Sequence, residues 1–249
     1  MEGTILAPGA SALSFVRLAS YAIGDTHPPL HAITTLHLNG WARHYIMPDQ
    51  LTRLLVSVPR LVNLSFDQFF INHPCDSTVP PQAVTLPYLR QLRLSGVLSS
   101  PTHLFALIDA PGLDEIWLSQ IHYFELAPLP SVRHLTLDEC LIDAADVARL
   151  ARATPNVVAL TAVTMASEIS KGLLTEDPPA AAVGRPWPAL RTLEMLGMDV
   201  MGASDLCYLA GMATEASFWL KERVEVQQSG SRERWPLGLG YHDPHYEAV

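Results

Sequence analysis

One spacing of apolar residues recurs eight times along the chain and limits the folds that it can adopt. The repeated unit has the form aliphatic-x-x-aliphatic-x-apolar-x-x-apolar, and all of its defining positions are apolar in a chain that is 49% hydrophobic. The units begin at Leu13, Ile33, Leu61, Leu89, Leu113, Val132, Val157 and Leu190. Self-similarity at a near-constant period is the signature of repeat architectures, so the whole fold should be built from one short unit.

The positions between these apolar residues are mostly polar. Successive side chains in a strand point to opposite faces, so the residues one before, one after and three after each central aliphatic should share a face. Of these 24 positions, 18 are polar or charged. The six apolar exceptions are Phe15, Ala19, Trp117, Ala159, Val163 and Leu196. Each unit therefore predicts a short strand with one buried face and one solvated face.

Proline gives a second, independent mark of the repeat. It stands two residues before the first aliphatic in six of the eight units, at Pro59, Pro87, Pro111, Pro130, Pro155 and Pro188. Proline lacks an N–H and disfavours helix in the residue before it, so it should end each return segment and begin the strand. Successive central aliphatics are 20, 28, 28, 24, 19, 25 and 33 residues apart. Their mean falls within the 20–29 residues of leucine-rich repeats.

Several segments between the strands predict helices. Ser100–Pro101 should open one through Ala110, and Asp143 should cap another over residues 144–153, because serine and aspartate accept from helix N-termini. Helical spacing recurs at Leu51, Leu54 and Leu55, and again at Leu206, Leu209 and Ala210. The segment between Leu118 and Val132 is too short for a full helix. Residues 166–188 predict an irregular surface excursion.

These elements together predict an α/β leucine-rich-repeat solenoid, with a curved parallel sheet inside and helices and irregular returns outside. A strand with its return cannot bury its own apolar face, so neighbouring units must stack to complete a core. We expect about eight repeats over residues 1–212. Residues 213–249 should form a C-terminal cap or tail, in which Phe218–Leu220 followed by Val224–Val226 could supply one last strand.

The unit P-x-[LV]-x-x-[LI]-x-[LFM] resembles the repeats of fungal F-box/leucine-rich-repeat proteins. It occurs here as LPYLRQLRLSGV, APGLDEIWLSQI, LPSVRHLTLDEC and WPALRTLEMLGM. Cys140 matches the cysteine that many intracellular repeats of this class carry where the strand ends. The resemblance covers roughly residues 12–213, and it implies that the repeats hold a substrate protein for ubiquitination.

In that family an N-terminal F-box binds the Skp-type adaptor of a cullin ubiquitin ligase. The first repeat of this chain begins at Leu13, which leaves no room for an F-box before it, and nothing in the chain resembles the LPxEI…W core of that motif. We therefore expect a Skp-type adaptor as a partner only if an F-box exists upstream. The chain could be a truncated product, a fragment without an independent role, or a relative that has lost the F-box.

Composition narrows the class of partner. The formal net charge of −9 argues against nucleic acid and anionic membrane surfaces as partners, because binding to them needs clustered lysine and arginine.

No segment approaches the roughly 20 apolar residues of a membrane helix, and the N-terminus lacks the positive charge of an export signal. Three widely spaced cysteines (Cys75, Cys140 and Cys207) do not suggest a disulfide framework. We expect an intracellular protein, cytoplasmic or nuclear.

The polar side of the strands is the predicted binding surface. Trp117 and Arg93 fall on adjacent predicted strands of the concave face, and residues of these types dominate the energy of protein interfaces. The alternative for Trp117 is that a loop from a neighbouring repeat shields it. The acidic or titratable residues around this pair suggest a partner with a basic patch. They are His37, Asp67, Glu115, His134, Asp138 and Glu194.

Catalytic and metal-binding patterns are scarce. There is no nucleophile elbow, P-loop, dinucleotide-binding glycine turn or paired-cysteine motif, so we expect neither an enzyme nor a cofactor. The alternative function is a metal-binding or enzymatic protein that uses the histidine-rich tail, His242-Asp243-Pro244-His245. Proline should hold that tail extended, and the sequence offers no second cluster to complete a tetrahedral site.

Overall fold

The computed structural model describes residues 13–19, 30–40, 45–68, 70–71, 83–96, 101–121, 126–163, 186–198, 211 and 213–220. The apolar unit and its polar complement fold there as predicted: every one of the eight repeated patterns forms a strand. These strands are β1 (Phe15–Ala19), β2 (Thr35–Asn39), β4 (Asn63–Asp67), β7 (Gln91–Ser95), β9 (Glu115–Ser119), β10 (His134–Asp138), β11 (Ala159–Val163) and β12 (Thr192–Met198).

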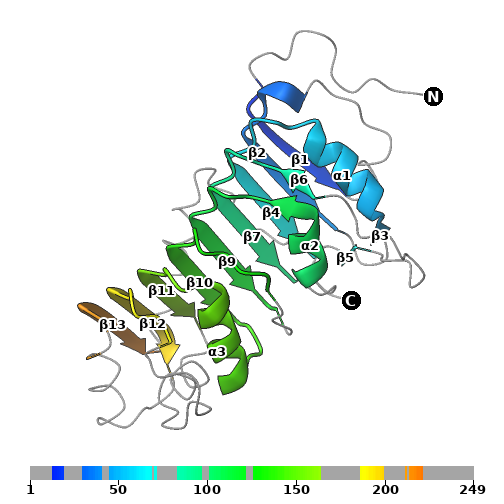
Figure 1. Ribbon diagram of the computed structural model, residues 1–249. Coiled ribbons are helices and arrows are strands. Elements are labelled where there is room, and N and C mark those ends of the chain that lie inside the picture. Colours follow the sequence, from blue (N-terminus) through cyan, green and yellow to red (C-terminus); the bar gives the residue numbers. More distant parts are fainter. Residues whose placement is uncertain are drawn as a thin grey trace, which may run out of the picture.

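A ninth strand, β13 (Glu215–Leu220), pairs with β12, which confirms the part of the predicted last strand at Phe218–Leu220. Its second part, Val224–Val226, lies outside the described residues. All nine strands form one sheet in which each strand neighbours the next one of the repeat series. Every pairing is parallel, and Figure 1 shows the strands stacked like the rungs of a ladder along the chain. The molecule is therefore an α/β protein built on a nine-stranded parallel sheet.

The pairing register aligns equivalent residues of the units. Leu36 pairs with Leu64, which pairs with Leu92, and that row continues through Ile116 and Leu135. From β2 to β12 the central aliphatics are at most 1% exposed and belong to one continuous core. A parallel sheet cannot slip by one residue without turning this row to solvent. The hydrophobic repeat thus fixes the register of the whole sheet.

A turn of constant form leads into most strands and explains the regular prolines. In each of six units the residue before the proline accepts a backbone hydrogen bond from the residue three positions on, as in Val58 with Leu61 (3.1 Å) and Leu129 with Val132 (3.2 Å). Proline then occupies the second position of the turn, where its fixed φ is favourable. Its role is to shape this turn, in addition to ending the return segment.

The opposite ends of four strands share a backbone feature that the sequence did not predict. The residue that follows the strand has a positive φ at Gln68 (48°), Gly96 (55°), Gln120 (54°) and Glu139 (49°). The N–H of each one donates to the next strand, for example from Gln68 to the carbonyl of Ser95 at 2.7 Å. Only one of the four positions holds glycine, so composition gives little signal of this turn.

The return segments carry three helices, α1 (Pro48–Val56), α2 (Pro101–Leu107) and α3 (Ala144–Ala153). Figure 1 shows them on one side of the sheet, where their buried residues join the core of the strands. Asp143 caps α3 as predicted, because its Oδ1 accepts from the N–H of Asp146 at 2.7 Å. α2 ends earlier than predicted: Ile108–Asp109 forms β8, so the helix does not reach Ala110.

Other short elements complete the returns. A 3-10 turn (η2) spans Leu30–Ala32, and two small parallel pairs lie beside the main sheet. One pair joins β3 (Tyr45–Ile46) to β5 (Phe70–Ile71), and the other joins β6 (Val84–Thr85) to β8. Two-residue strands carry no recognisable sequence period, which is why the sequence did not predict them.

One prediction about the returns was wrong at Trp187. We expected residues 166–188 to lie on the surface, but Trp187 is 1% exposed and its Nε1 donates to Thr154 Oγ1 at 3.2 Å. Trp187 precedes Pro188 and is the first residue of the turn. Val58 and Leu86 are the first residues of the same turn in their units, and they are buried as well. Residues 164–185 lie outside the described part of the chain, as do the predicted helix at 206–210 and Cys75 and Cys207.

Candidate functional site

The face of the sheet that points away from the core and helices is called here the polar face. Its central row follows the register from Arg17 through His37, Ser65, Arg93 and Trp117 on five consecutive strands. The row continues as Thr136, Thr161, Glu194 and Ser217. Rungs of a parallel sheet are about 4.8 Å apart, so these side chains form a line of adjacent groups.

All eight residues predicted for the binding surface lie in strands and on this face. His37, Arg93, Trp117 and Glu194 stand in the central row. Glu115 and His134 are in the row at the start of the strands, and Asp67 and Asp138 are in the row at their end. Alternation along the strands was therefore enough to place them on one face, although their accessibility differs widely.

Arg93 and Trp117 form the most specific contact on the polar face. The guanidinium carbon of Arg93 lies 4.1 Å from the centre of the Trp117 ring, which is the geometry of a cation–π interaction. Both side chains are partly buried. Trp117 Nε1 is buried and has no hydrogen-bond partner in the described structure. The ring is thus covered on one side by Arg93.

Burial, with smaller contributions from Arg17 and Arg93, shifts the pKa values of two groups on the polar face. Burial, with Arg17 and Arg93 as further causes, lowers the pKa of His37 from 6.5 to about 4, so this imidazole is neutral at pH 7. Burial also raises the pKa of Asp67. The hydroxyl of Ser95 and the two arginines favour the carboxylate and so oppose this shift. Both arginines therefore lie close enough to act on both groups.

Asp67 corrects the expectation of a uniformly solvated face. Its side chain is only 6% exposed, and Ser65 and Ser119 on the same face are buried as well. One oxygen of Asp67, Oδ1, is buried and has no hydrogen-bond partner in the described structure. The strand pattern distinguishes the two faces of the sheet, but it contains no information on what packs over a small polar residue. A partner could therefore contact Asp67 only after local rearrangement.

The acidic residues further along the sheet are tied to neighbouring strands. Glu115 accepts a hydrogen bond from Gln91 at 2.8 Å, and Glu194 accepts one from Thr161 at 3.4 Å. Asp138 likewise accepts one from Ser119 at 3.3 Å. His134 is half exposed, and its Nδ1 lies 3.8 Å from a carboxylate oxygen of Asp114 at the edge of the sheet. These bonds orient the carboxylates across the face.

Charge on the polar face is divided between its two halves. Strands β1 to β7 carry Arg17 and Arg93 against a single carboxylate, Asp67. Strands β9 to β13 carry four carboxylates and neither lysine nor arginine within the strands. These four are Glu115, Asp138, Glu194 and Glu215. The acidic character that we predicted for the whole face thus belongs to its C-terminal half.

The polar face holds residue types that occur in hydrolases, but they are not connected. Ser65 pairs in register with His37, and Asp67 is two residues further on. No hydrogen bond joins these three side chains in the described structure, and the carboxylate of Asp67 is instead bonded to Ser95. An activated serine needs a base within hydrogen-bond reach. His37, Ser65 and Asp67 are therefore not linked as a catalytic triad in the described structure.

The part of the chain that the structure describes contains no candidate metal-binding site. Within that part no three His, Cys, Asp or Glu side chains come together as metal ligands. The histidine-rich segment 242–245 lies outside it. Cys140 is buried, its thiol donates to the carbonyl of Leu118 at 3.3 Å, and burial raises its pKa to about 12. Cys140 therefore packs in the core.

Sequence reasoning missed Arg17 as a functional residue. It follows the central aliphatic Val16 just as Arg93 follows Leu92, so the same register rule would have found it. Its influence on both His37 and Asp67 makes it part of the same electrostatic group.

Comparisons with protein-family models, curated proteins and solved structures gave no match for this chain. None of the described helices is both long and apolar enough to cross a membrane.

Proposed function

We propose that this chain is a leucine-rich-repeat solenoid whose concave, polar face binds another protein without catalysis. It would resemble the substrate-recognition region of F-box ubiquitin-ligase adaptors. The observation that carries the proposal is the central row of the polar face, with the Arg93–Trp117 stack in its middle. Eight parallel strands that repeat one unit in chain order, followed by β13, support the solenoid.

The chemistry of this row suits a protein interface. Tryptophan and arginine supply most of the binding energy in such interfaces, particularly where surrounding polar groups exclude water. Trp117 and Arg93 are partly buried already, so little side-chain entropy would be lost when a partner packs on them. The small hydroxyl residues Thr136 and Thr161 leave room for the partner on the next two strands.

The preferred partner carries a basic patch. Its lysine or arginine residues would lie over β9 to β13, where Glu115, Asp138, Glu194 and Glu215 supply negative charge. Electrostatic complementarity of this kind mainly raises the association rate and falls with added salt. Binding should therefore weaken when ionic strength increases.

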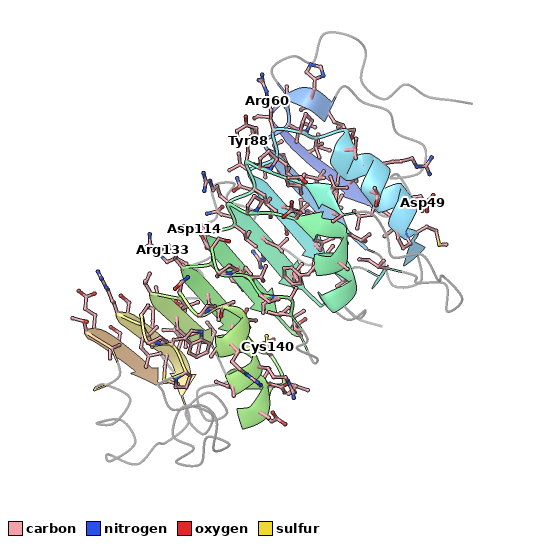
Figure 2. All side chains as sticks on the ribbon, in the orientation of Figure 1. Asp49, Arg60, Tyr88, Asp114, Arg133 and Cys140 are labelled. Atoms are coloured by element: carbon pink, nitrogen blue, oxygen red, sulfur yellow. The ribbon has the colours of Figure 1, made fainter. Side chains whose placement is uncertain are left out.

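The direct test is affinity capture of partners from a cell extract with the purified chain as bait. We expect a protein to be recovered, and recovery should fall at least tenfold with Arg93→Ala plus Trp117→Ala. Tyr88→Ala is the matched control, because Tyr88 is a large exposed aromatic residue at the edge of the sheet (Figure 2). Unchanged recovery with the double variant would show that the polar face is not the binding surface.

A further inference from the structure

A groove lies at the edge of the sheet where the strands begin, separate from the polar face. It encloses about 520 Å³ between the turns that lead into β10, β11 and β12. Volumes of about 300–1,000 Å³ are typical of small-molecule sites. Its floor includes Val158, Pro188 and Leu190, while Arg133 and Arg191 stand on either side of Val158. Figure 2 shows Arg133 at this edge.

The backbone ladder fixes the separation of the two arginines. The N–H of Val158 donates to the carbonyl of Arg133, and the N–H of Arg191 donates to the carbonyl of Val158, both at 2.8 Å. Arg133 and Arg191 are therefore two rungs apart, or about 10 Å between backbones. Arginine side chains on such a spacing can converge on one anionic group between them, and each guanidinium can bind two of its oxygens.

These two arginines differ from another arginine in the same edge row. Arg90 is used inside the fold, because its guanidinium donates to the carbonyl of Gly112 at 3.0 Å. Arg133 and Arg191 make no side-chain hydrogen bond or ion pair within the described residues. The nearest carboxylate in the row, that of Asp114, is in contact with His134. Two cations are thus left facing a groove that no acidic residue lines.

Small side chains at three successive turns leave the space of the groove open. The third turn position holds Ser131, Asn156 and Ala189 here, whereas the first two proline turns hold the large residues Arg60 and Tyr88. The turn between them has Gly112 at this position, but there the guanidinium of Arg90 fills the space. Asn156 is held in place, since its Nδ2 donates to the carbonyl of Pro130 at 2.8 Å. The side-chain hydroxyl of Ser131 and amide of Asn156 can donate hydrogen bonds beside the two guanidiniums.

We propose that this groove binds a small organic anion that carries a phosphate or carboxylate group. The anionic head would lie between the guanidiniums of Arg133 and Arg191, and the carbon skeleton would rest on Val158 and Pro188. Cations and neutral donors line the groove together with apolar surface, so a ligand with a charged head and an apolar body satisfies both. The site does not depend on the proposed protein-binding function, because it uses no residue of the polar face.

The test is an amide NMR titration of the isotope-labelled chain in phosphate-free buffer, with phenyl phosphate, benzoate, inorganic phosphate and neutral benzyl alcohol. We expect saturable shifts at Val158 and Ala189 with phenyl phosphate or benzoate, and none with benzyl alcohol. Arg133→Gln and Arg191→Gln should each weaken binding about tenfold, the effect of losing roughly 1.4 kcal/mol from a charge-assisted contact. Arg60→Gln, at an exposed edge position outside the groove, should bind like the wild type.

A second variant tests the groove without removing charge. Tyr88 shows that this turn position accepts a tyrosine. Ala189→Tyr should therefore fold normally, fill the groove and abolish binding. The proposal is overturned if no anion gives saturable shifts, or if Arg60→Gln weakens binding as much as Arg133→Gln does. Equal affinity for inorganic phosphate and phenyl phosphate would overturn the role given to the apolar floor.

Discussion

At the scale of single residues, the polar face is organised by charges that act on buried neighbours. Arg17 and Arg93 both favour the neutral form of His37 and the charged form of Asp67, while burial disfavours the charged form of each. The histidine is therefore a neutral polar group at physiological pH. Its ionisation should appear as a dependence of stability on pH.

His37 should make the folded chain less stable in mild acid. Its pKa is about 4 when folded, against an ordinary value of 6.5, so its contribution to stability is complete above pH 6.5 and is lost as pH falls towards 4. Between pH 7.5 and 5, the free energy of unfolding should fall by about 1–2 kcal/mol more in the wild type than in His37→Gln. Urea titrations at the two pH values measure the difference. Equal losses would mean that His37 ionises normally in the fold.

Trp187 should be among the more costly aromatic residues to replace. Trp187→Phe removes the hydrogen bond to Thr154 and leaves a cavity, so the free energy of unfolding should fall by about 1–3 kcal/mol. A double-mutant cycle with Thr154→Val should give a coupling of about 0.5–1.5 kcal/mol. Tyr88→Phe is the control at an exposed position and should cost less than about 0.5 kcal/mol. A Trp187→Phe cost that small would contradict the buried position.

At the scale of elements, each strand is bounded by two different turns. A turn with proline at its second position precedes the strand in six units, and a residue with positive φ follows it in four. The first turn is closed by a hydrogen bond within its own unit, whereas the residue with positive φ donates its N–H to the next strand. The regular edges of the sheet depend on both turns.

At the positive-φ positions, removing a glycine and introducing one should change the free energy of unfolding in opposite directions. Gly96→Ala should lower the free energy of unfolding by about 1–2 kcal/mol, because the left-handed conformation is unfavourable for a residue with a Cβ. The added Cβ would also lie 3.3 Å from Gln68 Cγ. Gln68→Gly should instead raise the free energy of unfolding by roughly 0.5–1 kcal/mol, because glycine adopts a positive φ without strain. Thermal or urea unfolding of both variants gives the answer, and changes of the same sign would refute this account of the turn.

At the scale of the whole molecule, most of the sheet could be predicted because one physical constraint repeats. Central aliphatics such as Leu36, Leu64 and Leu92 must align to share a core, so their spacing gives strand positions, pairing order and register together. Trp187 was missed although the same logic applied to it: it precedes a register proline as Val58 does. The positive φ of Gln68 and Gln120 was not predictable, since tertiary contacts impose it on ordinary residues.

The site was predictable in position but not in environment. Alternation placed Arg93, Trp117 and their neighbours on one face, because side-chain direction in a strand follows from sequence parity. The burial of Asp67 and the stacking of Arg93 on Trp117 depend on distances across strands and on packing over the face. A one-dimensional pattern contains neither quantity.

The most direct test of a protein-binding polar face is site-specific photocrosslinking to the captured partner. Benzoylphenylalanine introduced at Thr136 or Thr161, in the central row, should crosslink to the partner. The same group at Val56, an exposed residue at the end of α1, should not. Crosslinks from Val56 in preference to Thr136 and Thr161 would show that the helical side binds the partner and would contradict the proposed function.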